Sequence, residues 1–391
     1  MNSENKDKII SLRHLLHANP ELSMQEINTR HFLIDFLKKY TRLEIREYGH
    51  WFCALYHAPV PGAPMIAFRA DMDALPIPEG DAVPKDHASL HPGVSHKCGH
   101  DGHCAALAGF ALEVWQKQPS VNVCFLFQHA EETGQGGREC AEFLADAGCA
   151  AVYAVHNLSG YPENSIICRR GLTQCASRGL TLYFHGRASH ASQPEDGLSP
   201  AGALSRMVSY SQSLPHSHIF REKILCTVIR IHMGEKDFGI APGEGEISFT
   251  IRANQESDLE LLEQLLREKA AGLAAADGLS MEYQIADPFP ETRNHDSAIT
   301  AVEQAAKRLG KERIELPEPW RASEDFGYYT KKCPGAIFYV GNGTAYAPLH
   351  STDYDFNDRI LETIVDMYLE ILTEYCCPPS SVRTAGKFII K

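Results

Sequence analysis

The sequence of 391 residues contains no long hydrophobic run and no excess of positive charge. Apolar runs such as residues 121–127 are far shorter than the ~20 residues that a membrane-spanning helix needs. The net charge of −13 argues against nucleic acid or an anionic membrane as a partner, because phosphate groups are bound by a positive field. No apolar segment follows the charged N-terminal residues, so we expect no signal peptide and a cytoplasmic protein.

The sequence also lacks the cysteine spacing of a disulfide framework. Its 12 cysteines are scattered, and Cys53, Cys124 and Cys226 lie inside apolar runs. This distribution is typical of buried thiols in a reducing compartment. Only Cys98 has polar neighbours of the kind that bind metals.

Length and composition indicate a soluble globular protein with two domains, since 391 residues exceed one ordinary core. Apolar runs at residues 65–69, 121–127, 151–155 and 337–340 alternate with helical patterns. This alternation predicts an α/β fold with a parallel or mixed sheet covered by helices on both faces. Residues 178–287 instead follow the order β-α-β-β-α-β, which is typical of a ferredoxin-like α+β domain. We predict that this domain is inserted between residues 1–177 and 288–391, which form the larger domain.

Residues 96–103 read His-Lys-Cys-Gly-His-Asp-Gly-His. One glycine separates Cys98 from His100, so both side chains can reach a single point, and thiolate with imidazole favours zinc and its transition-metal neighbours. Further acids and an imidazole follow the ends of three predicted strands: Asp71, Asp73, Glu131, Glu132 and His156. Ligands of open α/β sheets bind outside the carboxyl ends of the strands, so these segments are expected to meet there. The pattern predicts a metal-dependent hydrolase.

The remaining polar residues have to be weighed against ordinary surface roles. Adjacent carboxylates such as Glu131 and Glu132 are common on surfaces, but at a strand end one can bind metal while the other moves protons. His350, in Pro-Leu-His-Ser-Thr-Asp, has weaker local support. From the residues alone, His190 is most simply a surface histidine, and Arg252 a solvated cation unless an anion lies opposite it.

Several segments together resemble the dimetal aminoacylase and carboxypeptidase superfamily. The resemblance is to the branch of hippurate hydrolases, N-acetyldiaminopimelate deacetylases and auxin-amino-acid conjugate hydrolases. It is carried, in order, by Leu-Leu-His-Ala-Asn-Pro-Glu-Leu-Ser (15–23), Arg-Ala-Asp-Met-Asp-Ala-Leu-Pro-Ile (69–77), Cys-Gly-His-Asp-Gly-His (98–103), Ala-Glu-Glu (130–132), His-Asn (156–157), Ser-His-Ala (189–191), Ser-Glu-Asp-Phe (323–326) and His350.

The resemblance implies hydrolysis of the amide bond of N-acyl amino acids, releasing a carboxylic acid and an amino acid. It implies two divalent metal ions (Zn, Mn or Co) per chain, bound by Cys98, His100, Glu132, His156 and His350. Glu131 would be the general base and Asp73 would orient a ligand from outside. Arg252 would receive the substrate carboxylate, and Asn157 is a further candidate substrate contact. The inserted domain would act as a lid and form a homodimer, in which His190 reaches the partner's site to polarise the scissile carbonyl.

Three departures from the branch leave the substrate open. The chain has His129 in Gln-His-Ala-Glu-Glu, which predicts an imidazole near the metals, and Lys97 adds a positive charge beside Cys98. Gly239 begins Gly-Ile-Ala-Pro, where the branch has a polar residue. The alternatives are a dipeptidase or aminopeptidase using the same metals, a catalytically silent binding protein, and a redox role for Cys98.

Overall fold

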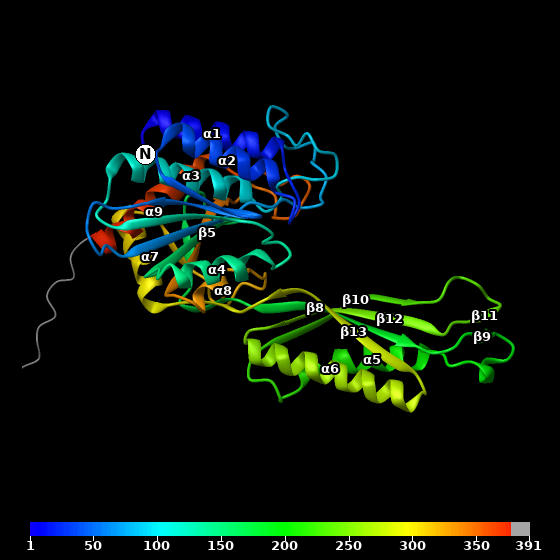
Figure 1. Ribbon diagram of the computed structural model, residues 1–391. Coiled ribbons are helices and arrows are strands. Elements are labelled where there is room, and N and C mark those ends of the chain that lie inside the picture. Colours follow the sequence, from blue (N-terminus) through cyan, green and yellow to red (C-terminus); the bar gives the residue numbers. More distant parts are fainter. Residues whose placement is uncertain (377–391) are drawn as a thin grey trace, which may run out of the picture.

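The computed structural model describes residues 1–376, which form two bodies joined side by side (Figure 1). The larger body is built on an eight-stranded mixed sheet. Its strands in spatial order are β1 (Glu44–Tyr48), β2 (Trp51–Tyr56), β4 (Asn122–Gln128), β3 (Met65–Asp71), β5 (Ala151–Ser159), β16 (Gly335–Gly343), β6 (Ile166–Cys168) and β15 (Arg313–Glu315). β3 runs parallel to both β4 and β5, and β5 runs parallel to β16, so these strands end at one edge.

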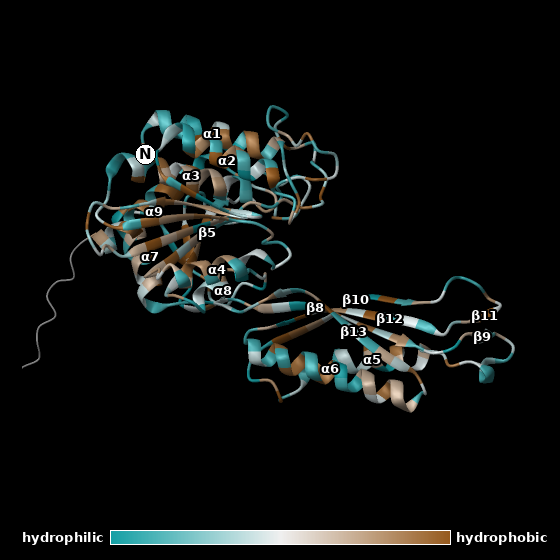
Figure 2. Cartoon of the chain, viewed as in Figure 1, coloured by the Kyte–Doolittle hydropathy of each residue, from teal (hydrophilic) through white to brown (hydrophobic). Residues whose placement is uncertain are grey.

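Helices cover both faces of this sheet, as the alternation of strands and helices predicts. One face packs against α1 (Ser3–Ala18), α2 (Ile27–Tyr40), α3 (His100–Lys117), α7 (Asp296–Arg308) and α9 (Leu361–Cys376). The other face packs against α4 (Gly136–Asp146) and α8 (Gly327–Thr330). The central strands are therefore buried on both sides and hydrophobic along most of their length, whereas the outer helix α1 mixes hydrophilic and hydrophobic residues (Figure 2).

The smaller body is an antiparallel sheet with helices on one face. Its spatial order is β10 (Ile224–Met233), β12 (Glu244–Ala253), β8 (Ala176–His185) and β13 (Ser280–Phe289). α5 (Ala201–Ser213) and α6 (Glu256–Ala276) lie on one face of this sheet (Figure 1). In the central strands β8 and β12, alternate side chains are buried in the core that these helices share with the sheet. The chain order β-α-β-β-α-β and this strand order are those of a ferredoxin-like fold.

Short elements connect the two bodies and close their loops. β7 (Gly171–Gln174) pairs with β14 (Thr292–Asn294) where the chain enters and leaves the smaller body. β9 (Ser189–His190) pairs with β11 (Ile240–Ala241) at the far end of that body (Figure 1). Single 3-10 turns span Pro194–Asp196, Leu214–His216 and Asp358–Ile360.

Two general expectations can be compared with the described residues. Every cysteine among residues 1–376 is free, and most are buried, as the scattered spacing predicts. None of the described helices combines the length and the apolarity that crossing a membrane requires. The sequence of residues 378–391 predicts a loosely held C-terminal tail, and these residues lie outside the described part of the chain.

Candidate metal centre

The turn before α3 sets Cys98 and His100 on the two sides of Gly99. Gly99 has a φ of +98°, and a Cβ built on it would lie 2.3 Å from the Asn157 side-chain oxygen, so only glycine fits there. The helix then begins at His100 and carries the imidazole toward the carboxyl edge of the sheet. The sequence Cys-Gly-His thus specifies a tight turn that presents both side chains to one place.

The five side chains expected to bind metal lie together at this edge. Cys98 Sγ is 3.3 Å from His156 Nε2 and 3.4 Å from His350 Nε2. Glu132 Oε1 is 3.6 Å from His350 Nε2 and 3.8 Å from His100 Nε2. Cys98, His100 and His156 form one group that could hold an ion, and Cys98, Glu132 and His350 form another. His156 lies inside β5, not after its end as expected.

The charges at this place fit a bound cation. The Nε2 of His100 and the Oε1 of Glu132 are buried and have no hydrogen-bond partner among the described residues. Burial raises the pKa of Glu132 to about 7, and burial together with Glu132 raises that of Cys98 well above its ordinary range. Burial also opposes the charge on His100, yet Asp71 and other nearby carboxylates raise its pKa to about 10. Crowded, buried anionic groups of this kind are what a divalent ion would neutralise.

Asp73 fixes two of these side chains from behind. Its carbonyl oxygen accepts a hydrogen bond from His100 Nδ1 at 2.8 Å, which turns Nε2 toward the cluster. Its carboxylate accepts from the backbone N–H of Glu132 at 2.9 Å and from the Ser23 hydroxyl at 2.7 Å. Asp73 thus contacts two of the candidate ligands, and its role in orienting a ligand stays a prediction.

Glu131 lies next to the cluster. It belongs to neither of these two groups, but with His100 and Glu132 it forms a further group that could hold an ion. It is 5 % exposed and lines the cleft above the five side chains. Burial raises the pKa of Glu131 well above its ordinary range, and the carboxylates of Glu324 and Glu132 raise it further. A carboxylate with raised proton affinity beside a cation site is suited to accept and return a proton.

The cleft over the cluster has a volume of 450 Å³. Besides the residues expected from the sequence, which include Arg252, it is lined by Gln174, Phe289, Trp320, Ala322, Ser323, Glu324 and Leu349. Trp320 packs edge-on against His156 with ring centroids 6.0 Å apart. No pattern in the sequence predicts a role for Trp320, although it stands shortly before Ser-Glu-Asp-Phe (323–326).

Other candidate residues lie outside this cleft. Asn157 is completely buried, with its side-chain oxygen 2.9 Å from His103 Nε2 and its side-chain nitrogen 2.5 Å from the Tyr354 hydroxyl, and its contact with substrate stays a prediction. His129 stacks on His50 with ring centroids 5.4 Å apart, and it is not among the residues that line the cleft. His190 is exposed on β9, next to the turn that contains Gly239, far from the cluster of its own chain (Figure 1).

Lys97 joins the segments that carry Cys98 and His350. Its side chain is fully buried, pairs with Glu79 and donates to the Tyr354 carbonyl at 2.9 Å. Its own carbonyl accepts from the His350 N–H at 2.7 Å. The extra positive charge noted in the sequence is therefore directed at Glu79 and the 350–354 loop and not into the cleft.

A buried histidine on α1 makes stability depend on pH. Burial opposes the charge of His17, but Asp101 and Glu79 outweigh burial and raise its pKa from 6.5 to about 9. The stabilisation is therefore complete below pH 6.5 and is lost as the pH rises through 9. At ~1.36 kcal/mol per pKa unit it amounts to about 3 kcal/mol.

The free energy of unfolding in urea should therefore fall between pH 6 and pH 10. This pH dependence should disappear in His17→Gln, whereas it should persist in the control variant His57→Gln, which replaces an exposed histidine. If the free energy of unfolding of His17→Gln falls with pH as steeply as that of the wild type, His17 is not the source of the pH dependence.

Comparisons with known proteins agree with this geometry. The profile of peptidase family M20/M25/M40 matches residues 67–374. N-acetylcysteine deacetylase from Bacillus subtilis is 30% identical over 344 residues, which cover 86% of this chain and 89% of the relative. N-acetyldiaminopimelate deacetylase from Exiguobacterium sibiricum is 27% identical over 375 residues, covering 94% and 99%. A dinuclear metal-binding peptidase of family M20 from Bacillus subtilis superposes with a TM-score of 0.79 at 26% identity, covering 95% of this chain and 98% of that chain.

Proposed function

Because the chain belongs to peptidase family M20/M25/M40 and is a metal-dependent amidohydrolase, we propose that it hydrolyses N-acyl amino acids to a carboxylic acid and an amino acid through the residues assembled in the cleft. The observation that carries this proposal is one cleft lined by Glu131, Arg252 and four of the five candidate ligands. The names of the two deacetylases support the same substrate class.

Each residue is given one role in this reaction. Two divalent ions, of zinc, manganese or cobalt, would be held by Cys98, His100, Glu132, His156 and His350 and would supply Lewis-acid activation of a water and of the amide carbonyl. Glu131 takes the proton from the attacking water and returns it to the departing amine. Asp73 keeps His100 and Glu132 in place. Arg252, which also lines the cleft, receives the carboxylate of the amino acid.

The smaller body would act as a lid and as the surface of a homodimer. Its edge strand β10 exposes Ile229 and Ile231, and the adjacent loop exposes Phe238 at 89 %. Exposed apolar side chains on an edge strand are suited to pairing with a second copy. His190 lies at the end of the same body, so a dimer could carry it to the partner's cleft, where it would polarise the scissile carbonyl (Figure 1).

A dipeptidase with the same metals is less favoured, since both curated relatives described above are named for removing acetyl groups. The decisive assay is amine release from a panel of N-acyl amino acids and dipeptides. We expect release from the acyl amino acids when manganese or zinc is present, and loss of that release with chelator that added metal reverses. Release from dipeptides alone would contradict the proposal, as would chelator-resistant activity.

A further inference from the structure

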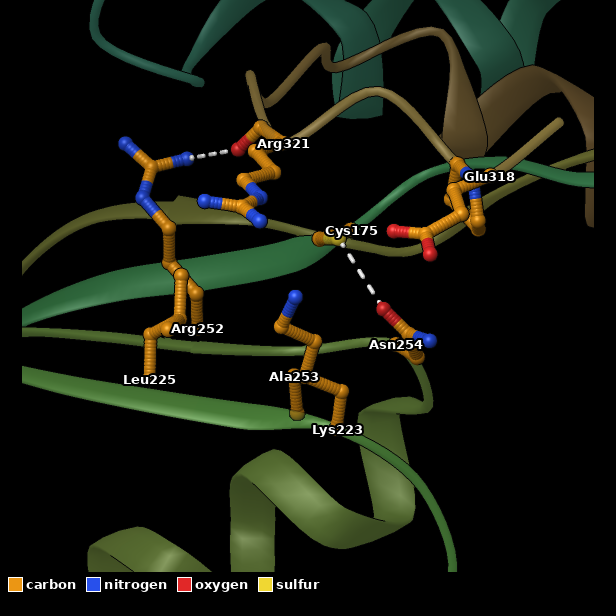
Figure 3. Close-up of a pocket in the computed structure, with 9 residues that line it drawn as sticks. Cys175, Lys223, Leu225, Arg252, Ala253, Asn254, Glu318 and Arg321 are labelled. Carbon is orange, nitrogen blue, oxygen red and sulfur yellow. Dashed lines mark hydrogen bonds between the residues drawn. The ribbon is translucent and has the colours of Figure 1, made fainter. Parts of the chain in front are cut away.

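A second cavity adjoins the cleft at the junction of the two bodies (Figure 3). It has a volume of 240 Å³ and is lined by Cys175, Lys223, Leu225, Arg252, Ala253, Asn254, Glu318, Pro319 and Arg321. Arg252 lines both this cavity and the cleft above the candidate metal centre. A group bound in the cavity would therefore lie just beyond the residue that we expect to hold the substrate carboxylate.

Three cations converge on this cavity without carboxylate partners. Arg252 donates to two neutral acceptors, the Arg321 carbonyl at 2.9 Å and the Ser323 hydroxyl at 2.6 Å. Within residues 1–376, neither Lys223, Arg252 nor Arg321 forms an ion pair. Burial raises the pKa of the Cys175 thiol, and the charges of all three cations act against that rise. In a chain of net charge −13, this small cavity is locally positive.

The positive charge is not spread evenly over the cavity wall. Figure 3 shows the guanidinium groups of Arg252 and Arg321 on one side of Cys175 and the Glu318 carboxylate on the other. An anion would bind at the end nearest Arg252, because Glu318 repels it from the opposite end. Guanidinium groups match the planar, two-oxygen geometry of a carboxylate.

We propose that this cavity binds a second carboxylate of the substrate, so that N-acyl derivatives of acidic amino acids are preferred. The inference rests on the proposed function, because Arg252 is taken to hold the α-carboxylate at the border of the cavity. Arg321 and Lys223 then remain for the side-chain carboxylate. The shared chemistry is a dicarboxylate, whose second acid could also stand at the end of the acyl group. The position beyond Arg252 assigns it to the amino-acid side chain.

The test compares substrates of equal shape and different charge. We expect kcat/KM for N-acetylglutamate to exceed that for N-acetylglutamine by about 10- to 100-fold, the size of a hydrogen bond to a charged group. Arg321→Met and Lys223→Met should lower this ratio, since each removes a cation, while Glu318→Gln should raise it. The carbonyl of Arg321 that holds Arg252 is kept in Arg321→Met. Lys307→Met on α7 makes the same charge change elsewhere and should leave the ratio as it is.

The outcomes separate this inference from the proposed function. Equal or better hydrolysis of N-acetylglutamine would overturn the acidic subsite while the amidohydrolase assignment stands. A preference for N-succinylalanine over N-acetylalanine, with no discrimination between glutamate and glutamine, would move the second carboxylate to the acyl side and overturn the assignment made here. Hydrolysis of no N-acyl amino acid in the presence of metal would refute the proposed function and this inference with it. Thermal unfolding of each variant shows whether a change in the ratio of the two kcat/KM values comes from the subsite or from a destabilised fold.

Discussion

Replacement of Glu131 by glutamine is expected to lower kcat by about 10²- to 10⁴-fold, the usual contribution of a general acid–base group. Glutamine fills the same space in the wall of the cleft but cannot accept a proton. Burial and the neighbouring carboxylates of Glu324 and Glu132 raise the pKa of Glu131. Glutamine relieves this repulsion, so the fold should be preserved. The measurement is kcat on an N-acyl amino acid together with the metal content of the purified variant, which should equal that of the wild type.

The adjacent residue supplies the matched control. Glu132→Gln makes the same chemical change one position along the chain, but Glu132 lies between His100 and His350. We expect this variant to lose bound metal, because an amide is a weaker ligand than a carboxylate. Activity lost in both variants, with metal lost only at Glu132, supports the division of roles. Full activity of Glu131→Gln with metal bound would show that another group moves the proton.

The fold and the gathering of the candidate ligands at one sheet edge could be predicted from the sequence for one physical reason. β3, β4 and β5 are buried on both faces, so their hydrophobic runs are continuous and easily recognised. The polar residues that interrupt or follow such runs are then conspicuous, and parallel pairing brings them to one edge. The ferredoxin-like order of residues 178–287 was equally clear from alternating and helical periods.

Features that depend on side-chain direction or on the junction of the bodies were not predictable in this way. His129 was expected near the metals, but neighbouring residues at a strand end point in different directions, and its ring turns to His50. The contact between the Asn157 side chain and the buried His103 ring was likewise not visible in the sequence. In the cationic cavity, Lys223 and Arg252 are brought together by the pairing of β10 with β12 in the smaller body, and Arg321 of the larger body joins them only where the two bodies meet.

Arg69 is the clearest case of a residue whose importance only the structure reveals. It is a fully buried cation near the end of β3, in the segment Arg-Ala-Asp-Met-Asp (69–73), whose two aspartates are the more conspicuous residues in the sequence. Its guanidinium bonds Asp71 at 2.8 Å, Asp325 at 2.7 Å and the Gln128 side chain at 2.9 Å, and lies 3.0 Å from Glu324. The carboxylates overcome the cost of burial and keep the pKa of Arg69 well above its ordinary range.

Arg69→Met should therefore lower the free energy of unfolding of the larger body by about 3–5 kcal/mol, the cost of removing one partner from a buried ionic cluster. The loss should exceed that of an ordinary cavity, because the carboxylates left behind are buried without a cation. Urea unfolding followed by tryptophan fluorescence reports on the larger body, because all three tryptophans lie there: Trp51, Trp115 and Trp320.

Two further variants decide how Arg69 acts. Arg46→Met removes an exposed pair with Glu44 from the same sheet and should cost less than about 1 kcal/mol. Arg69→Lys keeps the charge but has one nitrogen for partners that now occupy three, so it should recover only part of the stability. Full recovery by lysine would mean that charge alone holds the cluster. A loss in Arg69→Met no larger than in Arg46→Met would mean that the carboxylates are held apart without the guanidinium, by their own hydrogen bonds and by the strands that carry them.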